Sequence, residues 1–387
     1  MTIVSCTSNN KSESTLKSIE VNPTESKTIL YSELFTDVEV MKLESDGYNY
    51  LSEITKVIVK NNKIYILCSD MQSITIYNDD GELMTVFNKY GDGDGEYSSM
   101  ESFIVNDDES IEILDRNKLR VLKYDKDGTF LEEWKNNFLA WSVHKFNNDQ
   151  YAFYVGSEIL ASAPSRLIML SKKSNSITNH FLEISKQQAR FLNFRDLTNF
   201  SEADDGLAFV YSFNDTVYNV TPGSVTPKYF VNFGKYQLSN SFLKKEFANS
   251  YEFMMACRKT NSAFRIMGFY ESEKTIMFGF EFMGKFLHAY YNKSSNTSLV
   301  ANKYLMDLVF DKQIIETGFD LIPKAIHKNE LYTFIRASQF LKIMDSLKQS
   351  MSDENWVKYT QSNSNLIKIY KKTKTDDNPL ILRMKLK

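Results

Sequence analysis

A repeat with an offset of 47 residues occupies the first third of the chain. It aligns residues 63–87 (KIYILCSDMQSITIYNDDGELMTVF) with residues 110–134 (SIEILDRNKLRVLKYDKDGTFLEEW) without a gap. Each copy contains two short strands, an Asp-Gly hairpin turn and the start of a returning strand. Such an offset, about 40–50 residues, is typical of one four-stranded blade of a β-propeller. The matched positions are Ile64 with Ile111, Tyr77 with Tyr124, Asp80 with Asp127, and Gly81 with Gly128.

Four weaker copies of this unit follow. Their expected strands are 167–170, 207–210 with 216–220, 276–280 with 286–291, and 331–335 with 380–386. A ring of blades needs its last blade closed, because closure protects sheet edges, and Val38–Leu43 is the expected N-terminal partner. The sequence therefore predicts an all-β fold: a six-bladed β-propeller over residues 19–387, with four-stranded antiparallel blades.

Two local features refine this prediction. We expect the Asp-Gly pairs to supply the positive φ angles of tight primed turns. Apolar residues at helical spacing predict short helical insertions over Phe242–Met255 and Ser338–Met351.

Charge and hydropathy exclude two classes of protein. The chain has 46 basic and 49 acidic residues and a net charge of −3, without the one-sided basic excess of a nucleic-acid binder. No stretch approaches the roughly 20 apolar residues that span a bilayer. We therefore predict neither a nucleic-acid partner nor a transmembrane segment.

The N-terminus resembles a bacterial lipoprotein signal at its cleavage site. Ile3-Val4-Ser5-Cys6 is similar to a lipobox, and the polar residues after it suit a flexible tether over residues 1–18. Only five residues precede Cys6, without an apolar segment, so either the start is placed too late or the similarity is accidental. We expect lipidation at Cys6 and a location in the cell envelope, with the domain held on a membrane surface that faces the periplasm or outward.

The other two cysteines carry no motif. Cys68 ends an apolar run and is expected to be a buried, inert thiol, although a disulfide between Cys68 and Cys257 stays open. Four histidines without metal-ligand spacing predict no zinc site.

The segment 88–97 (NKYGDGDGEY) resembles the Gly-x-Gly-Pro-Gly-Glu-Tyr signature of the six-bladed β-propeller lipoproteins of Gram-negative gut anaerobes. Asp94 stands where the signature has proline, and segments 214–218, 227–234 and 377–380 also fit. The resemblance implies a propeller with NHL-like repeats and implies little about activity. The matching residues are Gly91, Gly93, Gly95, Glu96 and Tyr97.

Three groups of residues suit either a binding site or a structural role. The carboxylates of Asp92–Glu96 are similar to a calcium loop, but Met100 and Phe103 occupy two later ligand positions, so we predict an anchoring loop and no cofactor, with calcium as the alternative. Trp134, Phe138 and Trp141 either stack on a sugar or fill the space between blades. A third idea is an anionic pocket formed by the arginines near the insertions, which are Arg190, Arg195, Arg258 and Arg265.

Two functions remain. The favoured one is a non-catalytic binding or scaffold module for a glycan, peptide or envelope protein. The alternative is a metal-dependent propeller hydrolase or lyase, lactonase-like, with its site in the central channel. Asp70 and Asn117 occupy comparable points of the two clear copies and are tentative channel-side residues, while Asp115 aligns with Cys68. No catalytic residue is predicted.

Overall fold

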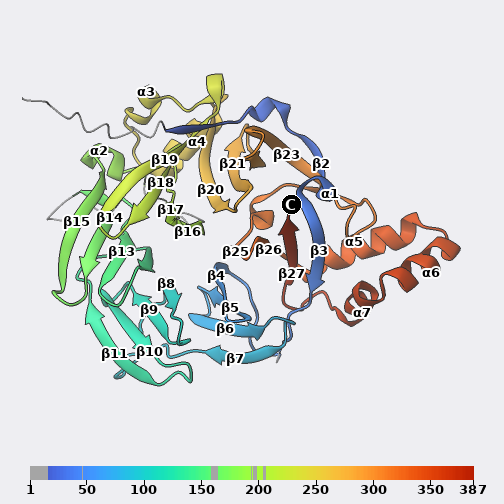
Figure 1. Ribbon diagram of the computed structural model, residues 1–387, viewed down its shortest axis with the longest axis horizontal. Helices are drawn as coiled ribbons and strands as arrows, with labels where there is room; N and C mark the ends of the chain where they lie inside the picture. Colours follow the sequence, from blue (N-terminus) through green and yellow to red (C-terminus); the bar gives the residue numbers. More distant parts are fainter. Residues whose placement is uncertain (1–15, 46, 158–163, 193, 195–197, 204–205) are drawn as a thin grey trace, which may run out of the picture.

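Six sheets stand around a common centre in the computed structural model, which gives the protein a propeller-like β fold (Figure 1). The structure describes residues 16–387 except 46, 158–163, 193, 195–197 and 204–205. We number the sheets 1 to 6 in chain order. In sheets 1 and 2 the order of the strands along the chain is also their order from the centre outward (Figure 1).

Sheets 1 to 4 are each built around four consecutive antiparallel strands. Sheet 1 contains β4 (Ile54–Lys60), β5 (Lys63–Cys68), β6 (Ser73–Asn78) and β7 (Leu83–Phe87). Sheet 2 contains β8 (Ser102–Val105), β9 (Ile111–Asp115), β10 (Arg120–Tyr124) and β11 (Phe130–Lys135). Sheet 3 contains β12 (Ser142–Lys145), β13 (Gln150–Tyr154), β14 (Ser165–Ser171) and β15 (Ser176–Glu183). Sheet 4 contains β16 (Phe200–Ala203), β17 (Gly206–Phe209), β18 (Thr216–Thr221) and β19 (Ser224–Asn232).

Sheets 5 and 6 contain the C-terminal strands. Sheet 5 contains β20 (Ala263–Glu271), β21 (Thr275–Phe282), β22 (Lys285–Asn292) and β23 (Thr297–Leu305), and the short β24 (Ile314–Glu316) pairs with β23. Sheet 6 contains β25 (Ala325–His327), β26 (Glu330–Ile335) and β27 (Leu380–Leu386). The strands expected from the weaker repeats therefore occur in separate sheets.

The segment before sheet 1 lies along the outer edges of three sheets (Figure 1). The strand β1 (Lys17–Glu20) pairs in parallel with β19, and β2 (Lys27–Leu30) pairs in parallel with β23. The strand β3 (Phe35–Met41) pairs antiparallel with β27 and is the fourth strand of sheet 6. Closure of the last sheet by the N-terminal segment is thus confirmed, although β1 begins two residues before the expected start of the domain.

The Asp-Gly turns differ from the expected primed geometry. Gly81 and Gly128 both have a φ of 82°, but Asp80 and Asp127 do not have positive φ. In the first turn the Asn78 side chain accepts hydrogen bonds from the backbone of Asp80 and Glu82, which holds a four-residue loop. The prediction was wrong about the aspartates because this side-chain hydrogen bonding lets the glycine alone carry the left-handed conformation.

The helices are short and lie outside the sheets. The first expected insertion consists of α3 (Asn240–Leu243) and α4 (Ser250–Arg258), because Asn249 caps a new helix through a hydrogen bond from the Glu252 backbone. The second is α5 (Ala337–Ser350), which is followed by two helices that the sequence analysis missed, α6 (Asp353–Ser362) and α7 (Ser364–Lys372). The remaining helices are α1 (Tyr31–Leu34), α2 (Lys186–Ala189) and the 3₁₀ turns η1 (Pro23–Glu25), η2 (Gly234–Tyr236) and η3 (Phe319–Leu321).

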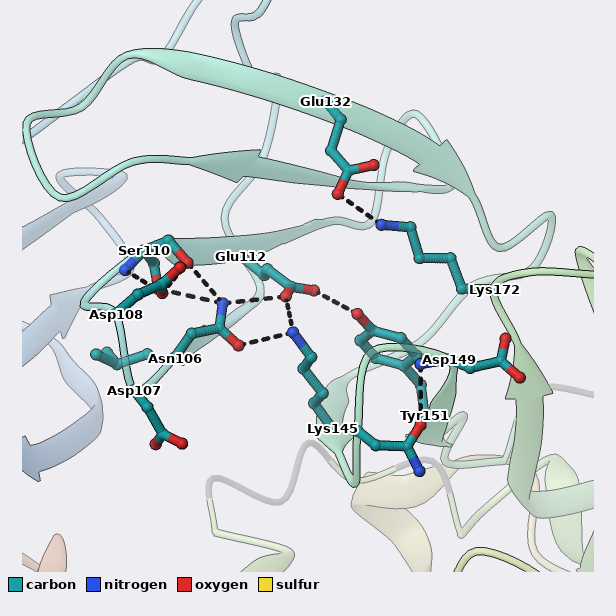
Figure 2. Close-up of polar contacts among 12 residues, drawn as sticks. Asn106, Asp107, Asp108, Ser110, Glu112, Glu132, Lys145, Asp149, Tyr151 and Lys172 are labelled. Carbon is teal, nitrogen blue, oxygen red and sulfur yellow. Dashed lines mark hydrogen bonds and ion pairs between the residues drawn. The ribbon is translucent and has the colours of Figure 1, made fainter.

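Apolar side chains fill the spaces between neighbouring sheets. Between sheets 2 and 3, Phe138 contacts Phe153 with ring centroids 5.3 Å apart, and Trp134 packs on Tyr151 at 4.8 Å. The packing interpretation therefore holds for these two predicted aromatic residues. The same gap also holds a buried polar cluster around Glu112, whose carboxylate binds the Lys145 ammonium at 2.6 Å (Figure 2).

Candidate functional site

Long connections and helices collect at one end of the ring. In a four-stranded antiparallel sheet, the link between the second and third strands and the link to the next sheet lie at the same end. We call this the loop end, and it carries every helix from α2 to α7. At the opposite end the hairpins are short, for example 61–62 and 222–223. The longest connections at the loop end are 88–101, 184–199, 233–262, 306–324 and 336–379.

The segment 88–97, which carries the family signature, is a tightly anchored loop at this end. The Gly93 backbone N–H donates a hydrogen bond of 2.8 Å to Glu96 Oε2, and a Cβ atom at Gly91 would lie only 2.1 Å from the same oxygen. Gly95 has a φ of 70°, and a Cβ atom there would lie 2.7 Å from the ring of Phe130. The three glycines therefore leave space for the Glu96 carboxylate and for a close approach to sheet 2.

Tyr97 anchors the other side of this loop. Its side chain is fully buried, and its hydroxyl donates to the Gln72 carbonyl (2.7 Å) and accepts from the Lys89 N–H (3.0 Å). Tyr124 adds a hydrogen bond of 2.8 Å to the Gly95 carbonyl. These contacts agree with the anchoring role expected for Glu96 and Tyr97.

The tentative channel-side residues lie in equivalent loops, and both are exposed. Asp70 follows β5 and accepts a hydrogen bond from Ser52, and Asn117 follows β9 and contacts Ser99 through its backbone N–H. Neither lines the hollow described next. Asp115 is fully buried and accepts hydrogen bonds from both Ser98 and Ser99, so its carboxylate fastens the loop before sheet 2.

A hollow opens at the loop end, between sheets 4, 5 and 6. It is open to solvent, and its cavity volume is about 30 Å³. Two aromatic residues, Tyr211 and Phe319, and two basic residues, Arg265 and Lys324, are among its lining residues. They come from the loop after β17, from β20 and from the connection 306–324. The hollow thus combines flat apolar faces with positive charge.

The strand β20 is irregular where it lines this hollow. Its pairing with β21 shifts between Phe264 and Met267, and Arg265 has a φ of 63°. A left-handed conformation costs a non-glycine residue about 1–2 kcal/mol. Arg265 lines the hollow, and its Nη1 lies 3.2 Å from the buried Glu281 carboxylate. Its Nε is buried and has no hydrogen-bond partner among the residues that the structure describes. Bulges of this kind commonly redirect a side chain near a binding site.

Lys324 supplies the second positive charge. Its ammonium lies 4.9 Å from the centre of the Phe319 ring, in a cation–π arrangement. Burial lowers the pKa of Lys324, and Asp320 partly opposes this effect. Within the described part of the chain, no carboxylate forms an ion pair with Lys324, since Asp320 pairs with Arg336 instead.

A third cation, from sheet 3, contacts one of the residues that line the hollow. The Arg166 guanidinium stacks over Tyr211, with its Cζ atom 4.7 Å from the ring centre. Arg166 is buried, and its Nη1 donates to the Gly156 carbonyl (3.4 Å) and to Ser157 Oγ (3.3 Å), which are both uncharged acceptors. Tyr211 is therefore held between a buried guanidinium and the hollow.

The remaining predicted residues are dispersed. Cys6 and Arg195 lie outside the described residues. Cys68 and Cys257 are both buried and free, so they do not form a disulfide. Arg258 shares the Glu281 carboxylate with Arg265, whereas Arg190 is exposed beside α2. Of the three described arginines in the suggested anionic pocket, Arg265 lines the hollow, and Arg190 and Arg258 do not.

Sequence reasoning missed the other main residues of the hollow. These residues belong to loops without a repeat pattern, so the sequence does not predict that they lie close together in space. They are Tyr211, Phe319 and Lys324. No group of three or more His, Cys, Asp or Glu residues is arranged to hold a metal ion among the residues that the structure describes. In the same part of the chain, no helix is long and apolar enough to cross a membrane.

Comparisons with known proteins agree with this fold. A protein described as exported, from Bacteroides fragilis NCTC 9343, superposes with a TM-score of 0.75 at 15% identity, over 96% of this chain and 100% of that one. A member of the DUF4221 family from Bacteroides vulgatus superposes with a TM-score of 0.51 at 11% identity, over 91% of this chain and 99% of that one. No curated protein sequence matches the chain. The DUF4934 family, described as a domain of unknown function, matches residues 16–385, and the chain therefore belongs to this family.

Proposed function

We propose that this protein is a non-catalytic binding module of the cell envelope. In this proposal each sheet is one blade of a six-bladed β-propeller, lipid on Cys6 holds the domain at a membrane surface, and the loop end binds a glycan, a peptide or an envelope protein. The fold serves as a rigid frame, and the loops supply recognition.

The asymmetry between the two ends of the ring is the observation that carries this proposal. The long connections and six of the helices lie at the loop end, while the described hairpins at the other end are short. Large apolar side chains are also exposed there, including Tyr48 (85% exposed), Tyr90 (60%) and Met283 (61%). Exposed aromatic and methionine side chains at one end favour recognition of a partner.

The envelope location has separate support. The structural neighbour from Bacteroides fragilis is described as exported, and the lipobox-like sequence at Cys6 suits an anchored protein. The anchor can be tested by metabolic labelling of the full chain with an alkyne analogue of palmitate in its native host. We expect labelling of the native chain and none of Cys6→Ser. Equal labelling of both would refute the anchor at Cys6.

Binding is tested with the purified full chain on arrays of envelope glycans and peptides and against purified envelope proteins. We expect Tyr90→Glu, at the loop end, to weaken binding of the partner at least tenfold. Met84→Glu is the matched control, because Met84 is similarly exposed (50%) but lies on β7, the outer strand of sheet 1 that precedes the connection carrying Tyr90. Equal effects of both substitutions would refute the assignment of the loop end.

Catalysis is tested on every partner that the arrays identify. Each is incubated with the protein and analysed by mass spectrometry for cleaved or rearranged products. We expect unchanged partners after many hours. Turnover that requires added divalent metal would instead establish the hydrolase or lyase alternative.

A further inference from the structure

The charge around the hollow is unbalanced. Arg265 and Arg258 share one buried carboxylate, that of Glu281, with N–O distances of 3.2 and 3.3 Å. Two more cations lie nearby: Lys324, which also lines the hollow, and Arg166, which stacks on Tyr211. Neither forms an ion pair with a carboxylate among the described residues. Among the described residues, Glu281 is therefore the carboxylate that forms ion pairs with two of these four cations, and Arg166 and Lys324 form none.

Such an arrangement is costly without a counter-ion. Removing a cation from water costs free energy unless a charge or a set of hydrogen bonds compensates for the loss. The lowered pKa of Lys324 reflects this cost, since burial is its largest cause. On the same lining, the buried Arg265 Nε has no acceptor among the described residues. A bound anion would offset both.

The apolar part of the lining limits the type of anion. Tyr211 and Phe319 contribute rings, and Ile322 and Met267 contribute aliphatic surface. Inorganic anions make no use of such surface, whereas an organic anion buries its apolar body against it.

We propose that the hollow binds a small organic oxyanion, with its charged group at Lys324 and Arg265 and its ring or aliphatic body against Tyr211 and Phe319. The proposal rests on the proposed function, because it assigns a ligand class to part of the loop end. It uses residues of sheets 4, 5 and 6 that the family signature does not include.

The experiment measures the thermal midpoint, Tm, of the full chain in benzoate, glucuronate or inorganic phosphate, each against sodium chloride of the same ionic strength. Benzamide and glucose are the uncharged counterparts. A ligand at about 100 times its Kd should raise the Tm of a chain of this size by about 3 °C. We expect a rise with at least one organic anion, and little or none with its uncharged counterpart or with phosphate.

Variants assign the effect to the hollow. Lys324→Met should abolish the rise, and because it removes a half-buried cation that forms no ion pair with a described carboxylate, it should leave the Tm in chloride unchanged or higher. Lys118→Met is the matched control, since Lys118 is at the loop end, outside the hollow, and pairs with the exposed Asp92 at 3.2 Å. If Lys324→Met does not fold, Lys324→Gln replaces it.

Three outcomes would overturn the proposal: no rise with any organic anion, an equal rise with phosphate, or an equal rise in the native chain and in Lys324→Met. The two proposals fail separately. A partner that binds the loop end without any effect of anions would remove only the anion site. An anion effect that depends on Lys324 would stand even if the arrays revealed no macromolecular partner.

Discussion

The buried ion pair between Glu112 and Lys145 joins sheets 2 and 3, and its removal should destabilise the ring measurably (Figure 2). The side chains of Glu112 and Lys145 are 2% and 11% exposed, and the distance from Nζ to Oε1 is 2.6 Å. Tyr151 donates to the other carboxylate oxygen at 2.9 Å, and Asn106 contacts both partners. The carboxylate is therefore fully engaged while Lys145 is present.

Lys145→Met leaves this carboxylate buried with only neutral donors. Breaking a buried pair by removing one partner costs about 3–5 kcal/mol of the free energy of unfolding. For 387 residues, an unfolding entropy of about 2.1 cal/mol/K per residue converts this loss into a decrease in Tm of about 4–6 °C. Calorimetry and urea unfolding at pH 7 measure both quantities.

Two further variants test the reasoning. Lys172→Met breaks the ion pair with Glu132, which joins the same two sheets (Figure 2). Because the Glu132 side chain is 46% exposed, we expect the free energy of unfolding to fall by less than about 1 kcal/mol. The double variant Lys145→Met with Glu112→Leu should recover most of the lost stability, because no buried charge remains. Equal losses for Lys145→Met and Lys172→Met would refute the argument, as would a double variant whose loss equals the sum of both single losses.

Three other predictions follow from the fold. Gly95→Ala should lower the free energy of unfolding by about 2 kcal/mol in urea, because its φ of 70° and the nearby Phe130 ring both oppose a Cβ atom. Gly223→Ala, with open space around it, should have no such cost. Burial lowers the pKa of His288 to about 4, below the ordinary value of about 6.5 for an unfolded chain. The stability that the neutral, buried His288 contributes is therefore fully present above pH 6.5 and is lost as the pH falls from 6.5 towards 4. In that window, His288→Gln should reduce the slope of the free energy of unfolding against pH by about 1.4 kcal/mol per pH unit. An unchanged slope would contradict the burial argument. Finally, a chain that begins at residue 42 lacks β1, β2 and β3 and should lose cooperative unfolding in circular dichroism, whereas a chain that begins at residue 35 lacks β1 and β2 but keeps β3 and should unfold cooperatively. Equal cooperativity of the two chains would show that sheet 6 does not need its fourth strand.

The local sequence determined much of the fold. Alternation of apolar residues and turn residues at regular spacing marked strands in all six sheets, and the N-terminal partner of the last sheet was found because a ring needs closure. The sequence predicts an anchoring loop over Gly91–Tyr97, and the contacts between its glycines and Glu96 span only a few residues of the chain. These features depend on neighbours in the chain, and so they can be read from it.

The helices and the turns show where local patterns were insufficient. Helices α6 and α7 were missed. The Asp-Gly turns were assigned the wrong geometry, because the preceding Asn78 side chain determines which residue is left-handed. Both errors concern segments in which side-chain hydrogen bonds or packing decide between several local conformations.

Only the tertiary structure determines which residues meet in the hollow. Tyr211, Arg265 and Lys324 lie more than 50 residues apart in the chain, and each belongs to a different sheet or connection. They meet because packing between sheets brings the loop ends of neighbouring sheets together, and the bulge in β20 then places Arg265 on the lining. Charge balance around a hollow depends on distances in three dimensions, so no spacing along the sequence could reveal that the Glu281 carboxylate pairs with both Arg258 and Arg265.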